Sequence, residues 1–171
     1  MIKTDILIIG AGPVGIFTVF EAGLLNLKCH IIDALGKPGG QCSEIYPKKP
    51  IYDIPGYPEI LAGELIDNLM EQCKQFKPGF TLGERAENIE QLEDKSFIVT
   101  TNKGTKHHAP VIAIAGGLGS FEPRKPVLEN LSSFENNGVE YIIQDPEIYK
   151  DKKILIAGGG DSALDWAIYL S

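Results

Sequence analysis

Two short glycine-rich segments hold the residues whose types and spacing could do chemistry. The first runs from Gly10 to Gly15 with the sequence GAGPVG, and the second runs from Gly158 to Ala163 with the sequence GGGDSA. They follow the patterns G-x-G-x-x-G and G-x-G-x-x-A, whose glycines allow a tight turn and a close approach of a pyrophosphate to the backbone. Free amides at the start of the following helix then face the phosphates. Each segment therefore predicts a dinucleotide-binding turn.

The first segment lies in the context that such a site requires. An apolar run at 6–9 precedes it, a helix-length apolar segment at 16–25 follows, and a second apolar run at 29–32 ends at Asp33. Asp33 comes 18 residues after Gly15, where a carboxylate can accept hydrogen bonds from ribose hydroxyls. The alternative is a glycine-rich turn in an ordinary α/β unit, and the pattern alone does not distinguish FAD from NAD.

Several further elements must position these residues. A stretch rich in glycine and proline at 36–58 contains Gly39-Gly40-Gln41 and three tyrosines, and so long an irregular loop is usually functional. Helical spacing of apolar residues predicts an amphipathic helix at 62–76, with Cys73 on its apolar face. Alternation and turn residues predict a β-meander that continues into a strand of the main sheet, with strands at 86–92, 96–101 and 105–115.

The last third of the chain contains a second loop and the second turn. Residues 118–126 form a glycine- and proline-containing loop, and short strands are expected at 139–143 and 152–157. A helix is expected to start at Asp161 or Ser162. Because a strand and a lone helix cannot complete a sheet, we expect residues 1–125 to form most of one nucleotide-binding domain and residues 126–171 to begin another.

Composition narrows the class of protein. The chain has 171 residues, a formal net charge of −7 and 43% hydrophobic residues, which argues against a nucleic-acid-binding protein and fits a globular one. Glycines and a proline interrupt the first apolar run by residue 15, so neither a signal peptide nor a membrane span is expected, and we expect a cytoplasmic protein. Three separated cysteines fit reduced thiols. His107 and His108 are adjacent on a predicted strand and therefore make a poor metal-binding pair, so no metal site is expected.

Two dinucleotide turns in one chain, 148 residues apart, suggest electron transfer between two nucleotide cofactors. Such proteins usually hold a flavin throughout and bind a nicotinamide transiently. Hydride transfer to a flavin needs mainly positioning and exclusion of water, so we assign no catalytic acid or base.

Four segments carry a resemblance to a known family. GAGPVG, GGQCSEIYPKKPIYDIPGYP, AIAGGLGSFEPRKP and ILIAGGGDSALDWA occur in this order, and together they resemble ferredoxin–NADP reductase of the thioredoxin-reductase-like type. The resemblance implies a Rossmann-like α/β domain that binds FAD non-covalently, followed by the start of an NADP-binding Rossmann domain. It further implies a homodimer at full length, in which NADPH reduces the flavin and the flavin passes single electrons to ferredoxin or flavodoxin.

The same resemblance implies roles for individual residues. Tyr46 would stack on the flavin and Gln41 would bond near it, Phe121 would pack beside the cofactor, and Asp33, where many relatives have glutamate, would bind the adenosine ribose. Ala86 would contact the adenine end through its backbone. The remaining residues would serve the phosphates of the two nucleotides: Gly10, Gly12, Val14 and Gly15 for FAD, and Gly158, Gly160, Asp161, Ser162 and Ala163 for NADPH.

The positions of the cysteines distinguish this chain from two branches of such flavoproteins. Glutathione-reductase-like enzymes carry a second cysteine five residues after the first, where this chain has Pro47, and thioredoxin reductases carry C-x-x-C before the second turn, where this chain has YIIQDPE. Without a dithiol, electrons must leave the flavin directly. Two alternatives remain: a related flavin reductase with a quinone or thioredoxin-type acceptor, and an inactive nucleotide-binding fragment. We expect weak or no FAD affinity, and no NADPH turnover, from these 171 residues alone.

Overall fold

The computed structural model describes residues 1–119, 125–135, 137–141, 143 and 146–171. The chain divides into two units, Met1–Arg124 and Lys125–Ser171, which are described separately. Their assignment to an FAD-binding domain and to the start of an NADP-binding domain stays a prediction.

A parallel four-stranded sheet forms the centre of the first unit. Its order is β10 (Val111–Ile114), β2 (Ile6–Ile9), β3 (Cys29–Asp33) and β6 (Gly79–Leu82), and every neighbouring pair is parallel. The carboxyl ends of the strands therefore meet at one edge of the sheet. Helix α1 (Pro13–Leu24) connects β2 to β3, as the sequence pattern around the first glycine-rich segment predicts.

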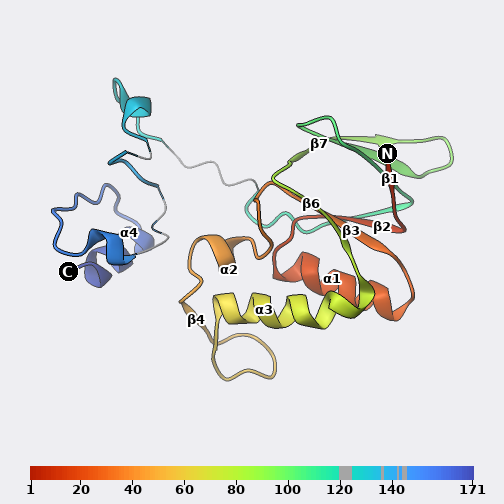
Figure 1. Ribbon diagram of the computed structural model, residues 1–171, viewed down its shortest axis with the longest axis horizontal. Coiled ribbons are helices and arrows are strands. Elements are labelled where there is room, and N and C mark those ends of the chain that lie inside the picture. The colour runs from red at the N-terminus through yellow and green to blue at the C-terminus, as the bar shows by residue number, and fades with distance from the viewer. Residues whose placement is uncertain (120–124, 136, 142, 144–145) are drawn as a thin grey trace. The chain divides into compact units, whose positions relative to one another are not determined.

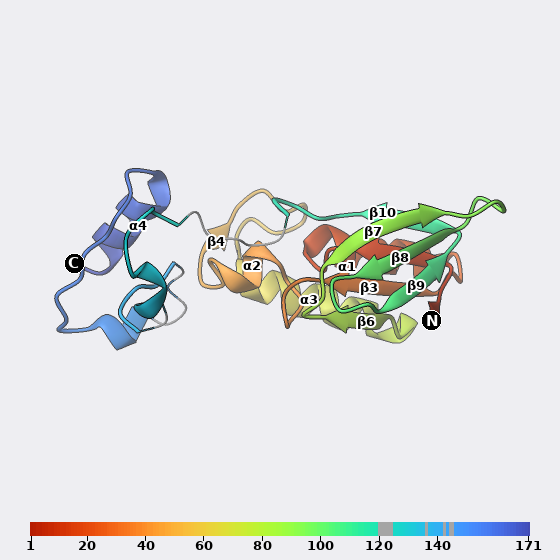
Figure 2. The ribbon, with the colours of Figure 1, turned by 90° about the horizontal axis from the view of Figure 1, so that it is seen from above.

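Two layers cover the faces of this sheet. Helices α1 and α3 (Ala62–Cys73) pack on one face, with the short helix η1 (Lys74–Phe76) directly after α3 (Figure 1). A meander of β7 (Ala86–Gln91), β8 (Phe97–Thr101) and β9 (Lys106–Ala109), joined by β1 (Ile2–Lys3), lies on the other face (Figure 2). Successive strand residues serve opposite layers, because Ile8 packs in the helix-side core and Leu7 in the meander-side core.

Most predicted elements of the first unit are confirmed, with three corrections. The single strand expected at 105–115 is two strands in different sheets, β9 and β10, which are separated by Pro110, a residue without a backbone N–H. Strands β1 and β6 were not predicted. The loop expected at 36–58 contains helix α2 (Gln41–Glu44) and strand β4 (Pro50–Ile51), which pairs with β5 (Ile60–Leu61).

The second unit contains helices η2 (Leu131–Ser133), η3 (Pro146–Tyr149) and α4 (Asp161–Tyr169), and α4 starts where the second turn predicted. The strands expected at 139–143 and 152–157 are wrong for the residues described there. Val139 forms only an isolated bridge to Glu135, and residues 152–157 pair with no strand in the described part of the chain. A strand needs hydrogen-bonded neighbours, and an apolar run alone does not supply them.

None of the helices in the described residues combines the length and the apolar character that crossing a bilayer requires.

Candidate functional site

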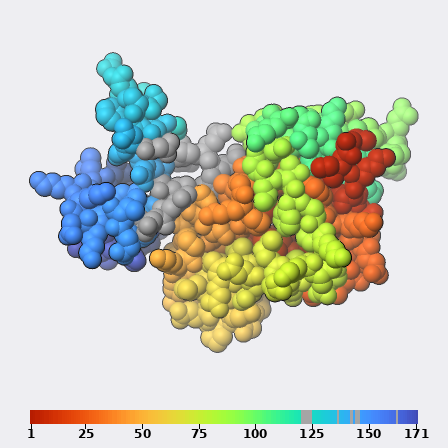
Figure 3. All heavy atoms as spheres, viewed as in Figure 1, coloured from red at the N-terminus to blue at the C-terminus, as the bar shows by residue number. Residues whose placement is uncertain are grey.

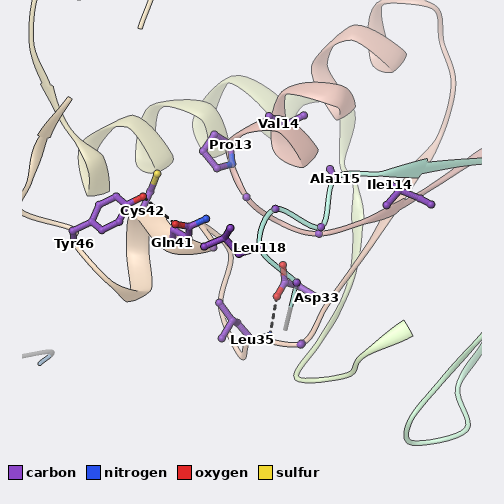
Figure 4. Close-up of a pocket in the computed structure, with 17 residues that line it drawn as sticks. Pro13, Val14, Asp33, Leu35, Gln41, Cys42, Tyr46, Ile114, Ala115 and Leu118 are labelled. Atoms are coloured by element: carbon purple, nitrogen blue, oxygen red, sulfur yellow. Dashed lines mark hydrogen bonds between the residues drawn. The ribbon is translucent and has the colours of Figure 1, made fainter. Parts of the chain in front are cut away.

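A cavity of about 620 Å³ opens at the carboxyl ends of the parallel strands (Figure 4). Segments that follow β2, β3 and β10 line it, together with α2 and the residue Tyr46 that follows α2. This edge is where open α/β sheets bind their ligands, and the volume lies in the range of small-molecule sites.

The glycine turn forms one wall of the cavity, and at two of its glycines the neighbouring backbone atoms leave no room for a side chain. Gly10 has a φ of +109°, and a Cβ there would lie 2.2 Å from the carbonyl oxygen of Ala115. A Cβ at Gly15 would lie 1.9 Å from the carbonyl oxygen of Gly10, so this glycine allows α1 to pack against β2. Gly12 differs, because a Cβ there would meet nothing within 4 Å. The open space beside Gly12 lies at the cavity, where a phosphate could approach the backbone.

Asp33 lies at the end of β3 and holds two loops in place. Its Oδ2 accepts a hydrogen bond from the amide of Ala11 at 2.5 Å. Its Oδ1 accepts one from the amide of Leu35 at 2.8 Å, and Figure 4 shows this second bond. The carboxylate thus fixes the glycine turn to the segment after β3. Each oxygen keeps a further lone pair for a ligand hydroxyl.

Gln41 and Tyr46 form the end of the cavity beside α2. The hydroxyl of Tyr46 donates to Oε1 of Gln41 at 3.3 Å, and Figure 4 places both side chains beside Cys42. The Tyr46 ring offers an aromatic face of the kind on which a planar ligand stacks. Lys49 Nζ lies 5.8 Å from the centre of that ring.

The structure brings six of the predicted site residues together and separates others from them. The cavity is lined by Gly10, Gly12, Val14, Asp33, Gln41 and Tyr46. Gly15 is buried behind the turn in α1, and Ala86 lies in β7 and does not line the cavity. Phe121 lies outside the described residues. The roles of all of these residues in binding a nucleotide stay predictions.

The predicted residues of the second turn lie in the second unit. Gly160 is the N-cap of α4, and Asp161 is the acidic residue of its first turn. Gly158 has a φ of +156°, and a Cβ there would lie 3.3 Å from Cβ of Ala163. Ser162 lies within α4.

Apolar lining residues were missed by the sequence reasoning. Leu35, Ile114 and Leu118 line the cavity: Leu35 follows β3, Ile114 is the last residue of β10, and Leu118 lies on the segment after β10 (Figure 4). Their positions at or just after the carboxyl ends of predicted parallel strands could have identified them from the sequence, because ligands bind at that edge of the sheet.

The three cysteines of the first unit are buried and free. Burial raises the pKa of the Cys29 thiol to about 11, and it raises the pKa of the Cys42 and Cys73 thiols as well. Cys73 also donates a hydrogen bond to the carbonyl oxygen of Ile16. Thiols with raised pKa values form little of the thiolate that disulfide exchange requires.

Comparison with known proteins identifies the family. A family model described as pyridine nucleotide-disulphide oxidoreductase matches residues 4–171. The chain belongs to this family. The assignment agrees with a parallel sheet that carries a glycine turn at its carboxyl edge.

Curated relatives and solved structures agree with this assignment. The chain is 78% identical to ferredoxin–NADP reductase 2 of Christiangramia forsetii, over all of this chain and 48% of that protein. It is 73% identical to ferredoxin–NADP reductase of Flavobacterium johnsoniae, over all of this chain and 49% of that protein. The chain thus spans about half the length of the curated relatives it matches.

The likeness to a solved structure extends to the fold. The structure of Lactococcus lactis thioredoxin reductase superimposes with a TM-score of 0.77 at 27% identity, covering 98% of this chain and 52% of that one. Together these findings confirm the Rossmann-like α/β fold class and the resemblance noted in the sequence.

Proposed function

We propose that this chain supplies the FAD site and the first part of the NADPH site of a ferredoxin–NADP reductase. The full-length enzyme passes electrons between NADPH and ferredoxin or flavodoxin through a non-covalent flavin. The observation that carries the proposal is the single cavity that unites the glycine turn, Asp33 and the Gln41–Tyr46 pair. The relatives named ferredoxin–NADP reductase, at 51–78% identity, support the same enzyme class.

The residues of the cavity fit a flavin dinucleotide in chemistry. The open backbone at Gly12 and the start of α1 suit a pyrophosphate, because helix amides and the helix dipole favour negative charge. Asp33 suits a ribose, and the Tyr46 ring suits a flat aromatic system. When bound, FAD supplies the chemistry that converts a hydride into single electrons. The chain itself binds and orients the cofactor and limits its contact with water.

The same proposal assigns NADPH binding to the second unit, at the N-terminus of α4. Gly160 is the N-cap residue of α4 and Asp161 is its first residue, so in this proposal the helix amides there would meet the phosphates of the nucleotide. It also assigns the full-length protein to the cytoplasm, as a homodimer without membrane or nucleic-acid partners. The raised pKa values of the buried cysteines favour direct transfer from the flavin over a disulfide relay.

Absorbance titration tests the FAD site directly. FAD is added to the purified full-length protein, and free and bound cofactor are separated by gel filtration before the visible spectrum is recorded. A bound flavin band that weakens in Tyr46→Ala supports the site, and Tyr52→Ala is the control because Tyr52 is exposed and lies outside the cavity. A spectrum with equal flavin in wild type and Tyr46→Ala contradicts the assigned role of Tyr46.

Reduction assays on the full-length protein test which electron acceptor it uses. We expect NADPH-dependent reduction of ferredoxin or flavodoxin, and little reduction of thioredoxin or of small disulfides. Rapid reduction of a disulfide substrate with no reduction of ferredoxin would overturn the proposed activity. A flavoprotein that reduces only quinones would instead identify it as a related reductase of the same fold.

A further inference from the structure

The turn that presents Tyr46 is hydrogen-bonded to the beginning of α3. The amide of Lys49 donates to the carbonyl oxygen of Tyr46 at 3.0 Å and closes the turn. The amide of Gly63 then donates to the carbonyl oxygen of Pro47 at 2.8 Å, and the amide of Ala62 donates to that of Lys49 at 3.0 Å. We name these last two hydrogen bonds the clasp.

The clasp satisfies groups that a helix leaves unpaired. Ala62 and Gly63 are the first two residues of α3, and the N-cap residue Leu61 provides no side-chain acceptor. The first amides of a helix need acceptors from outside the helix, and carbonyl oxygens also complement the positive end of its dipole. The turn after Tyr46 therefore serves as the cap of α3, and α3 in turn fixes the turn.

A short strand pair continues this attachment away from the cavity. Pro50 pairs with Leu61 and Ile51 pairs with Ile60, so β4 and β5 close the loop at 52–59. That loop is mostly exposed and forms the amber lobe at the lower edge of the first unit in Figure 3. The clasp and the strand pair thus lie between this exposed loop and Tyr46.

Gly63 sets how closely the turn can approach α3. A Cβ at this position would lie 3.1 Å from the carbonyl oxygen of Pro47 and 3.4 Å from Cβ of Pro47. Alanine would therefore push the turn away by a few tenths of an ångström. Since Gly63 has no positive φ, the constraint is steric and does not arise from its backbone conformation.

We propose that Gly63 and the clasp are a positioning device for the flavin-binding aromatic residue Tyr46. The inference rests on the proposed function, because it treats the cavity as a flavin site. Gly63 itself lies outside the cavity lining, so it acts through the turn and has no contact with the cofactor. Substitution at Gly63 should therefore disturb flavin binding while leaving the helix intact.

Hydrogen exchange followed by NMR tests the clasp without any cofactor. In Gly63→Ala we expect the amides of Ala62 and residue 63, the two donors of the clasp, to exchange about tenfold faster than in wild type, because local opening becomes easier. Gly36→Ala is the matched control, since a Cβ at Gly36 meets nothing within 4 Å and its φ is not positive. Alanine favours a helix over glycine by about 1 kcal/mol, so the melting temperature should not fall.

Measurements of flavin binding test whether the clasp positions Tyr46 for the cofactor. In the full-length protein we expect the dissociation constant for FAD to rise about tenfold in Gly63→Ala, since small misplacements of a positioned group weaken its interactions steeply. The flavin's visible circular dichroism, which reports its aromatic neighbour, should change in this variant and stay unchanged in Gly36→Ala.

The outcomes separate the two proposals. Unchanged exchange at Ala62 and residue 63 overturns the clasp, whatever the flavin does. Faster exchange with FAD affinity and circular dichroism equal to wild type leaves the flavin site standing and overturns the positioning role of Gly63. A full-length wild-type protein that takes up no FAD overturns the proposed function, and the positioning role falls with it.

Discussion

At the scale of single residues, the site depends on a few polar contacts and on places where a side chain cannot fit. Asp33 joins two loops through two backbone amides, and Tyr46 is held by Gln41. Gly10 and Gly15 are fixed by backbone atoms that leave no room for a Cβ. Such constraints act over a few ångströms, so short sequence patterns can reveal them.

His107 is an unusual residue in the meander-side core. It is fully buried in β9, and neither of its ring nitrogens meets a hydrogen-bond partner among the described residues. A buried polar atom without a partner lowers stability, so His107→Leu should raise the free energy of unfolding by about 1 kcal/mol. Urea titration checks this. His108→Leu is the control and should not stabilise the protein, because His108 Nε2 lies 2.9 Å from Ser96 Oγ. A less stable His107→Leu variant would show that the ring nitrogens make favourable interactions.

His30 should make stability depend on pH. Burial, and secondly the neighbouring His107 with ring centres 4.9 Å apart, lowers the pKa of His30 to about 4 from 6.5. Between these values the unfolded chain binds more protons than the folded one, so stability is complete above pH 6.5 and is lost as the pH falls towards 4.

The expected size of this effect follows from the two pKa values. Lowering the pH from 7.5 to 5 should cost about 2 kcal/mol through His30 alone. Urea unfolding at both pH values measures the loss. His30→Gln, which can keep a hydrogen bond to Thr81 Oγ1, should show a smaller pH-dependent loss. An equal loss in this variant would assign the pH dependence to other groups.

At the scale of elements, the sequence predicts those whose signal is local. The apolar runs at 6–9 and 29–32, the helical spacing at 62–76 and the alternation at 96–101 all correspond to elements of the structure. Strand β6 has the sequence GFTL, too short and irregular to signal a strand, and its pairing with β3 defines it. The reverse happens at 152–157, where an apolar run finds no strand partner in the described part of the chain.

The residues of the candidate site also divide into those that a local sequence pattern predicts and those that only the pairing of distant strands brings together. The glycine turn and Asp33 belong to one continuous pattern, so the sequence predicts that they meet, and they do. Leu35, Ile114 and Leu118 come together only because β10 pairs with β2 far along the chain. No local pattern contains that pairing.

The contact of α1 with η1 depends on one small residue. Gly23 is buried near the end of α1, and a Cβ there would lie 2.3 Å from ring atoms of Phe76. Gly23→Ala should therefore lower the free energy of unfolding by about 1 kcal/mol net, since overpacking exceeds the gain in helix propensity. Thermal melting measures the loss.

A second substitution provides the control for Gly23. Phe76→Leu removes the ring, so adding Gly23→Ala to it should cost less than adding Gly23→Ala to the wild type. Equal costs in the two backgrounds would show that the strain at Gly23 does not come from Phe76.

At the scale of the whole molecule, the two units differ in how well they bury apolar side chains. The first unit contains both buried clusters, whereas the second exposes large apolar residues, among them Leu155 at 92% and Ile168 at 76%. Burial of apolar surface is the main stabilising contribution in folding. The first unit should therefore be the more stable of the two.

The position of the tryptophan makes this difference measurable. Trp166 is the only tryptophan of the chain, and it lies in α4 of the second unit, where its ring contacts Tyr169 at 5.8 Å between centres. Its fluorescence reports on the second unit, whereas far-ultraviolet circular dichroism is dominated by the strands and helices of the first. In a urea titration we expect the fluorescence transition to occur at a lower concentration than the dichroism transition, because two units of unequal stability break two-state behaviour. Coincident transitions would instead show that the units unfold together, and that the exposed apolar residues of the second unit do not lower its stability relative to the first.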